Sequence, residues 1–181
     1  TVKTIWDNQR ILDDLCVNVE LVIHAAGIYG QDCVADQETA LQVNGLNTMR
    51  LLSSAIKSNV KRFIYLSTAH VYAAPLTGIV NENNCPSNLH PYATSHLAGE
   101  HAVLFANQLE QVEGIVLRIS NGFGAPIHKN VNCWMLLVND LCRQAVETRE
   151  MKLKTSGLQQ RDFISITDLC NVIEKFTFLK F

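Results

Sequence analysis

Tyr92 and His96 are the side chains best suited to proton transfer in this sequence. They stand four residues apart in a helix-like run that begins at Pro91, so both lie on one helix face. A phenol has a pKa near ~10 and needs a lowered pKa to act as a base at neutral pH. An imidazole, with a reference pKa of about 6.5, is mostly neutral at pH 7 and supplies no permanent charge. Side chains at this spacing can act together, and a neutral His96 can donate one hydrogen bond.

The cysteines do not indicate a metal or redox site. The chain has 6 cysteines, without a Cys-x-x-Cys pair or a paired His–Cys spacing. They are Cys16, Cys33, Cys85, Cys133, Cys142 and Cys170. We interpret them as reduced thiols of a cytoplasmic protein and expect no metal.

Composition excludes several classes of function. The 181 residues are 48% hydrophobic and 18% charged, which is typical of a globular domain. A formal net charge of -2 without a long basic run does not support binding to nucleic acid or an anionic membrane. No apolar stretch approaches the roughly 20 residues of a membrane span, and residues 1–10 lack the order of a signal peptide.

Short apolar runs alternate with helical patterns and would position Tyr92 and His96. The runs at 20–24, 62–67, 114–119 and 163–166 predict strands. Residues 39–58, 91–109 and 131–147 predict helices, and Thr167 or Asp168 is expected to cap a last helix. Nearly continuous apolar strands separated by helices indicate an α/β doubly wound parallel sheet covered on both faces. Residues 73–90 carry the turn chemistry of a long loop.

A Gly-x-Gly-x-x-Gly loop, which lets the backbone approach a dinucleotide, does not occur in this sequence. Its nearest equivalents are the glycine pairs Gly27–Gly30 and Gly122–Gly124. Both pairs lack the third glycine and a following helix in the right place.

Six short segments of the sequence, taken together and in their order, indicate a family resemblance. They are Val22-Ile-His-Ala-Ala26, Val43-Asn-Gly-Leu-Asn-Thr48, Lys61-Arg-Phe-Ile-Tyr-Leu-Ser-Thr-Ala-His-Val-Tyr72, Pro91-Tyr-Ala-Thr-Ser-His-Leu-Ala-Gly-Glu100, Leu117-Arg-Ile-Ser-Asn-Gly-Phe-Gly124 and Arg161-Asp-Phe-Ile164. Together they resemble the extended short-chain dehydrogenase/reductases, specifically the NAD-dependent sugar epimerase/dehydratase family. His96 stands where the family's Tyr-x-x-x-Lys motif has lysine, and Asn47 replaces the usual glycine of the second segment.

The resemblance implies a Rossmann-like fold, NAD or NADP as cofactor, and a nucleotide sugar or other small molecule as substrate. It implies that Tyr92 is the general acid or base, that Thr68 orients the substrate oxygen, with adjacent Ser67 as the less favoured hydroxyl, and that His96 occupies the lysine position. Cofactor contacts would come from His24, Ala25, Ala26, Asn44, Ser67, Tyr92 and His96, and substrate contacts from Asn121 and Arg161. A homodimer through helices 39–58 and 91–109 is left open.

The resemblance also implies that the family's first strand–Gly-loop–helix unit and its last substrate-binding segments are absent. Residues 1–181 would then form a partial NAD(P)-binding domain, with fragments of the substrate-binding region around 122–160. We therefore expect the chain to bind NAD weakly or not at all. Three interpretations of His96 remain: a weakened copy, a retuned active site, or an error in the sequence.

Residues 69–70 help to distinguish between the reactions that the family catalyses. Family 4,6-dehydratases carry Asp-Glu after the orienting hydroxyl, whereas this chain has Ala69-His70. Epimerisation or ketoreduction is therefore favoured over dehydration. A noncatalytic binding or scaffold protein and a reductase of non-sugar carbonyls are the alternatives, and whether this chain is an enzyme stays open.

Overall fold

The computed structural model describes residues 5–73, 75–128 and 130–179. Ala74, within the predicted loop 73–90, lies outside them. The chain divides into two compact units, Thr1–Ile119 and Ser120–Phe181, each of which is described by itself. The assignment of residues 1–181 to one partial domain stays a prediction.

Three parallel strands form the sheet of the first unit, in the order β1-β2-β3. They are β1 (Leu21–His24), β2 (Arg62–Thr68) and β3 (Glu113–Ile119), which confirms the strands predicted there to within one residue at each end. Leu21 lies opposite Arg62, and Arg62 lies opposite Glu113. Because the strands are parallel, their carboxyl ends meet at one edge, where α/β proteins bind ligands. His24 and Thr68 are the last residues of β1 and β2 at this edge.

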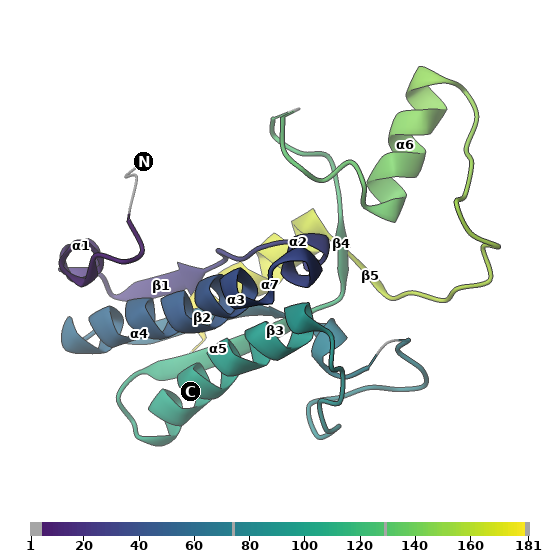
Figure 1. Ribbon diagram of the computed structural model, residues 1–181. Coiled ribbons are helices and arrows are strands. Elements are labelled where there is room, and N and C mark those ends of the chain that lie inside the picture. Colours follow the sequence, from purple (N-terminus) through teal and green to yellow (C-terminus); the bar gives the residue numbers. More distant parts are fainter. Residues whose placement is uncertain (1–4, 74, 129, 180–181) are drawn as a thin grey trace. The chain divides into compact units, whose positions relative to one another are not determined.

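Helices pack against this sheet, and α4 and α5 lie side by side across it (Figure 1). The helical elements of the unit are α1 (Gln9–Cys16), α2 (Gly30–Ala35), α3 (Gln37–Ala40), the π-helical turn η1 (Leu41–Leu46), α4 (Asn47–Lys57), the 3-10 helix η2 (Ala69–Val71) and α5 (Pro91–Gln108). Proline opens α5 at a position where its missing N–H breaks no hydrogen bond. The imidazole of His90 accepts from the backbone N–H of Tyr92 at 3.1 Å and caps the helix. The helix predicted at 91–109 is thus confirmed.

The helix predicted at 39–58 is interrupted rather than regular. Its central turn, Leu41–Leu46, is a π-helix between α3 and α4. Such turns insert one residue into an α-helix and are frequent at functional sites. The apolar periodicity across 39–58 does not reveal this insertion because both flanking segments are helical.

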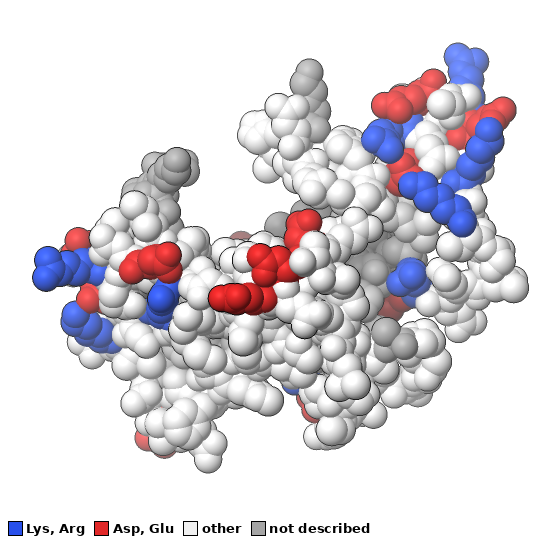
Figure 2. Space-filling model, in the orientation of Figure 1, with Lys and Arg blue, Asp and Glu red and all other residues white. Residues whose placement is uncertain are grey.

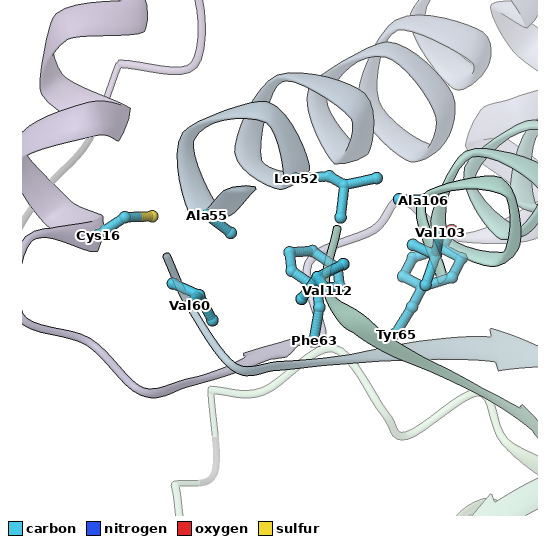
Figure 3. Close-up of a cluster of buried hydrophobic side chains, with 9 residues drawn as sticks. All are labelled: Cys16, Leu52, Ala55, Val60, Phe63, Tyr65, Val103, Ala106 and Val112. Atoms are coloured by element: carbon cyan, nitrogen blue, oxygen red, sulfur yellow. The ribbon is translucent and has the colours of Figure 1, made fainter. Parts of the chain in front are cut away.

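The core of the first unit lies between the sheet and helices α1, α4 and α5, as Figure 3 shows. Its buried members are Cys16, Leu52, Ala55, Val60, Phe63, Tyr65, Val103, Ala106 and Val112. Phe63 and Tyr65 of β2 are both 0% exposed. Burial of a large apolar side chain contributes about 1.5–3 kcal/mol, so these alternate residues attach β2 firmly to the helices.

The second unit contains a two-stranded parallel sheet and two helices. Its elements are β4 (Asn121–Phe123), α6 (Leu137–Glu147), β5 (Phe163–Ser165) and α7 (Ile166–Phe178). The prediction of a helix from 131 was wrong by six residues, because residues 131–136 make turn bonds such as Leu136 N–H to the Cys133 carbonyl at 3.2 Å. The predicted cap of the last helix was also wrong. Ser165 caps α7, accepting from the backbone N–H of Asp168 at 3.0 Å.

Charged side chains are mixed in sign on the face that Figure 2 shows, with acidic and basic residues together over α6. No helix in residues 5–73, 75–128 and 130–179 has both the length and the apolar character needed to cross a bilayer. In the same residues, His, Cys, Asp and Glu form no cluster of three that could hold a metal ion.

Candidate active site

Tyr92 and His96 meet at the start of α5, next to the carboxyl edge of the sheet. Their rings contact each other edge to face, with centroids 4.6 Å apart. This is the geometry expected of side chains four residues apart on one helix face. Tyr92 is half-buried, whereas His96 is only 5% exposed. The structure therefore brings together the two residues that the sequence singled out.

Thr68 provides a hydroxyl beside Tyr92. Burial raises the pKa of Tyr92 above its usual value, and the neighbouring Thr68 side chain counters this in part because it favours the ionised phenol. The Thr68 hydroxyl also accepts from the backbone N–H of His70 at 3.1 Å and thereby caps η2. The interaction places a proton donor or acceptor next to the phenol, but it leaves Tyr92 protonated at neutral pH.

His96 is a neutral imidazole in this environment. Burial, with a smaller effect from His24, lowers the pKa of His96 to about 4. Its Nδ1 lies 2.8 Å from the hydroxyl of Tyr65. The position that holds lysine in the family motif therefore carries no positive charge to stabilise a phenolate at Tyr92.

Asn44 connects three segments around the site. It lies in η1 and is 0% exposed. Its Oδ1 accepts from the backbone N–H of Ile28 at 3.0 Å, and its Nδ2 donates to the Ser95 hydroxyl at 3.0 Å. Its backbone carbonyl accepts from the hydroxyls of Thr48 at 2.7 Å and Tyr65 at 3.2 Å. Asn44 thus holds the segment after β1 against α5.

The segment after β1 is open where a cofactor would need to approach. Ala25, Ala26 and Gly27 are all exposed. A Cβ added at Gly27 would lie 3.1 Å from Asn44 Oδ1 and 3.6 Å from His96 Cε1, so the glycine keeps free space beside both side chains. This cradle, formed by Gly27, Asn44 and His96, suits the close approach of a nucleotide to the backbone.

His24 is the last residue of β1, three positions before Gly27. It is 3% exposed, its Nε2 is 2.9 Å from the Thr48 hydroxyl, and its ring stacks on Tyr65 with centroids 5.5 Å apart. Burial lowers the pKa of His24 to about 4. These contacts are those of a core histidine with a satisfied hydrogen bond, and a direct contact of His24 with cofactor stays a prediction.

The hydroxyl of Ser67 forms its hydrogen bond with Glu100. It donates to the carboxylate of this residue, which is 0% exposed. Arg118 donates to the same carboxylate through Nη2 at 2.6 Å and to the Tyr72 hydroxyl through Nη1 at 2.7 Å. Of the two candidate hydroxyls, Thr68 is therefore the one that interacts with Tyr92. A catalytic or cofactor-binding role for Ser67 stays a prediction.

Asn121 and Arg161 belong to the second unit. The side-chain amide of Asn121 donates to the backbone carbonyl of Asp162 at 2.9 Å, which joins β4 to the segment before β5. Arg161 is exposed, and its Nη2 is 3.4 Å from Gln159 Oε1. Their roles in substrate binding stay predictions.

Sequence reasoning missed Tyr65 and Glu100. Glu100 follows His96 by one helical turn, just as His96 follows Tyr92, so the spacing itself contained that signal. Tyr65 precedes Ser67 by two residues on β2 and therefore shares its face of the sheet. A phenol within an apolar strand gives no sign, from the sequence alone, that its hydroxyl reaches a histidine.

Comparison of the sequence and the fold with known proteins identifies the family of this chain. The model of the NAD dependent epimerase/dehydratase family matches residues 1–176. The chain belongs to the NAD-dependent epimerase/dehydratase family. The family resemblance and the Rossmann-like α/β fold predicted from the sequence are confirmed, and NAD or NADP is the cofactor class that accompanies them.

Relatives within the epimerase/dehydratase family extend beyond the length of this chain. A dTDP-6-deoxy-L-talose 4-dehydrogenase (NAD(P)(+)) of Kitasatospora kifunensis is 29% identical over 86% of this chain and 48% of its own length. MoeE5, solved with UDP-glucuronic acid and NAD, superposes with a TM-score of 0.85 at 22% identity, over 99% of this chain and 59% of that protein. A UDP-glucuronic acid 4-epimerase from Bacillus cereus gives a TM-score of 0.83 at 24% identity, over 99% of this chain and 55% of the epimerase. The chain spans about half the length of the curated relatives it matches.

Proposed function

We propose that this chain carries the acid–base half of an NAD(P)-dependent nucleotide-sugar epimerase or ketoreductase, with slow turnover. The observation that supports this most directly is the interaction of Tyr92 with Thr68 at the carboxyl edge of the sheet. The names of the relatives, a talose 4-dehydrogenase and a glucuronic acid 4-epimerase, support a sugar carbon bearing a hydroxyl or carbonyl as the reacting centre.

The residues of this chain would handle the proton. When bound, a nicotinamide supplies the acceptor or donor of hydride. In its phenolate form, Tyr92 takes the proton from the sugar hydroxyl during oxidation, and as the protonated phenol it returns this proton to the carbonyl oxygen during reduction. Thr68 holds that oxygen beside the phenol. His96 and Asn44, at the cradle next to Gly27, would hold the cofactor without charge.

Slow turnover follows from the neutrality of His96. A base is most effective when its pKa is near the working pH, and the pKa of Tyr92 is raised by burial. An ammonium at position 96 would counter this effect, whereas an imidazole with a pKa of about 4 does not. This supports the weakened or retuned interpretations of His96.

Epimerisation or reduction is proposed in preference to dehydration. Elimination of water needs a further acid and base next to the reacting carbon. Residues Ala69–Val71 form η2 directly after Thr68, and Ala69 has no group that could serve in either role.

The same neutrality of His96 favours a second candidate function. A noncatalytic binding or scaffold protein would retain the cradle and the buried network but would not need a basic Tyr92. A reductase of non-sugar carbonyls would use the same two residues, Tyr92 and Thr68, and is distinguished by its substrate alone.

We also propose a homodimer through α4 and α5. These helices lie side by side, and the α5 side chains of Leu104 and Phe105 are 42% and 60% exposed. Leu41, in the adjoining η1, is 54% exposed. Apolar side chains concentrated on neighbouring helices are typical of an interface between subunits.

Proton NMR of the chain with NAD and a UDP- or dTDP-hexose tests the proposal directly. We expect slow formation of the 4-epimer or of a 4-keto sugar, and its loss in Tyr92→Phe, which removes only the phenolic oxygen. Thr94→Ala, at an exposed position on the same helix turn, is the matched control. Product formation that survives Tyr92→Phe would contradict the proposal. Binding of NAD and sugar without conversion would establish the noncatalytic alternative instead.

A further inference from the structure

The loop at 73–90 lies between η2 and α5 and is longer than most connections between such elements. Its last residues return to η2 and form hydrogen bonds with it. The backbone N–H groups of Ser87 and Asn88 both donate to the Val71 carbonyl at 3.2 Å. The end of the loop is therefore attached to the segment that directly follows Thr68.

The side chain of Asn88 extends this attachment in two directions. Its Nδ2 donates to the His70 carbonyl at 2.7 Å, and its Oδ1 accepts from the His90 backbone N–H at 3.0 Å. Because a backbone carbonyl only accepts and a backbone N–H only donates, these partners fix the orientation of the amide. Asn88 thus bridges η2 and the residue that precedes α5.

Each end of this bridge continues to a residue of the candidate active site. The His70 backbone N–H donates to the Thr68 hydroxyl oxygen at 3.1 Å, and the imidazole Nδ1 of His90 accepts from the Tyr92 backbone N–H at 3.1 Å. Four hydrogen bonds with fixed donors therefore connect the Thr68 hydroxyl with the backbone of Tyr92. The side chains of Thr68 and Tyr92 are themselves neighbours, so this chain of bonds closes into a ring.

We propose that Asn88 and His90 are positioning residues that hold the phenol of Tyr92 and its neighbouring threonine hydroxyl at the distance needed for proton transfer to and from a substrate oxygen. The proton transfer rests on the proposed function, whereas the placement of the two hydroxyls rests on contacts within the chain. Misplacement of reacting groups by about 1 Å can slow catalysis ~10²-fold. A link between the two segments that carry these groups therefore has a kinetic consequence.

The placement of Tyr92 is measurable on the chain without any ligand. Spectra of protein labelled with ¹³Cζ-tyrosine, recorded at pH 8, report the surroundings of each phenolic oxygen, and Tyr92→Phe identifies Tyr92 among the 4 tyrosines. Asn88→Asp keeps the acceptor for the His90 N–H but loses the donor to the His70 carbonyl, which opens the ring at one bond. We expect the Tyr92 resonance to shift in Asn88→Asp and, without an added charge, in Asn88→Ala.

Asn84→Asp is the matched control, because it places the same charge in the same loop. The Oδ1 of Asn84 accepts from the Asn81 backbone N–H at 2.7 Å, a bond outside the ring that aspartate retains. The Tyr92 resonance should stay unchanged in this variant. The backbone bonds of Ser87 and Asn88 to η2 remain in all these variants, so none of them should unfold the chain. An unchanged Tyr92 resonance in both Asn88 variants, or an equal shift in Asn84→Asp, would overturn the proposal.

Substitutions of His90 test the other end of the bridge. His90→Ala removes the acceptor for the Tyr92 N–H, whereas His90→Asn supplies a side chain that is preferred at helix N-caps. Hydrogen exchange of this N–H should be about fivefold faster in His90→Ala and should return toward the parent rate in His90→Asn. Exchange that is equally fast in both variants would refute the role of His90.

A double-mutant cycle separates a ring from two independent contacts. Opening the ring at Asn88 or at His90 should shift the Tyr92 resonance similarly, and the double variant Asn88→Ala/His90→Ala should give no further shift. Shifts that add in the double variant would show that the two residues act separately and would refute the ring.

Kinetics with NAD and a nucleotide hexose connect the ring with the proposed reaction. Asn88→Asp should lower kcat about tenfold and leave KM unchanged, because positioning of reacting groups acts on the transition state. Asn84→Asp should keep the parent kcat. A higher KM with unchanged kcat in Asn88→Asp would contradict positioning. If the parent chain shows no turnover, the proposed function fails, and the spectra of Tyr92 still decide the roles of Asn88 and His90 because they need no ligand.

Discussion

Arg118 of β3 donates two hydrogen bonds to the carboxylate of Glu100 of α5, from Nη2 at 2.6 Å and from Nε at 3.0 Å, both to Oε2. The side chains are 18% and 0% exposed, respectively, so the carboxylate is buried and the guanidinium is largely covered. Ser67, which lies opposite Arg118 in the sheet, completes the arrangement by donating to Glu100. The pair and Ser67 together therefore join β2, β3 and α5.

Removal of Arg118 should destabilise the chain severely. Arg118→Met leaves Glu100 as an unpaired buried charge, and breaking such a pair typically costs about 3–5 kcal/mol. The free energy of unfolding from urea titration measures the loss. Lys61→Met is the matched control, because Lys61 and its partner Glu20 are 72% and 77% exposed and exposed pairs contribute about 0–1 kcal/mol. Equal effects of the two substitutions would contradict the importance of burial.

Stability should fall in mild acid because His24 and His96 are buried as neutral imidazoles. Burial lowers the pKa of each from 6.5 to about 4, so the unfolded chain binds more protons below pH 6.5. The full stabilisation is therefore present above pH 6.5 and is lost as the pH falls toward 4. The loss is on the order of 1–3 kcal/mol for each histidine.

Free energies of unfolding measured at several pH values check this expectation. His96→Gln should reduce the pH dependence by roughly half, since one of two similar groups is removed. His101→Gln, at an exposed position in the same helix, should leave the dependence as it is. A stability that stays constant between neutral and mildly acidic pH would show that both imidazoles are accessible to protons in the folded chain.

Lysine at position 96 should lower the pKa of Tyr92. A positive charge next to the phenol favours the phenolate, whereas the present imidazole is neutral. Ultraviolet titration of tyrosinate in His96→Lys detects the change, and Tyr92→Phe identifies the contribution of Tyr92 among the 4 tyrosines. His101→Lys places the same charge on the exposed side of α5 and serves as the control.

Restoration of lysine should also raise turnover at pH 7, if the parent chain turns over substrate at a measurable rate. A titration curve for Tyr92 that is identical with histidine and lysine at position 96 would refute the electrostatic account of slow turnover.

A charged residue at position 105 should prevent dimer formation. Phe105→Glu places a carboxylate among the exposed apolar side chains of α5, where it would lose its hydration in an interface. Light scattering should give about twice 20.2 kDa for the parent chain and 20.2 kDa for the variant. Val146→Glu, at an 83% exposed site in α6, should keep the parent mass. A parent chain of monomer mass would refute the homodimer.

The strands and the helix around Tyr92 were predictable because their signals are local. Strands β1–β3 are short apolar runs, and Pro91 marks the start of α5. The tertiary contacts were not predictable in this way. The bond of Tyr65 to His96 and the pair of Glu100 with Arg118 join segments that are distant in the sequence. The π-turn η1 lies between two helical segments, and the apolar periodicity does not reveal it.

The second unit was predicted less accurately than the first. Residues 131–136 have the apolar character of the helix that follows them, so periodicity extended α6 too far. Ser165 caps α7 from the last position of a strand, a place where sequence rules favoured Thr167 or Asp168 instead.

Gly99 determines how closely these segments approach. A Cβ at this position would lie 2.8 Å from the Asn44 carbonyl oxygen and 2.9 Å from the Tyr65 hydroxyl, distances that atoms do not occupy without displacement. Any larger residue would push α5 away from η1 and from β2 together, and would carry His96 with it. The distances between α5, η1 and β2 thus depend on the absence of a Cβ at position 99. Substitution of lysine for His96 will restore the site only in a chain that keeps glycine at 99.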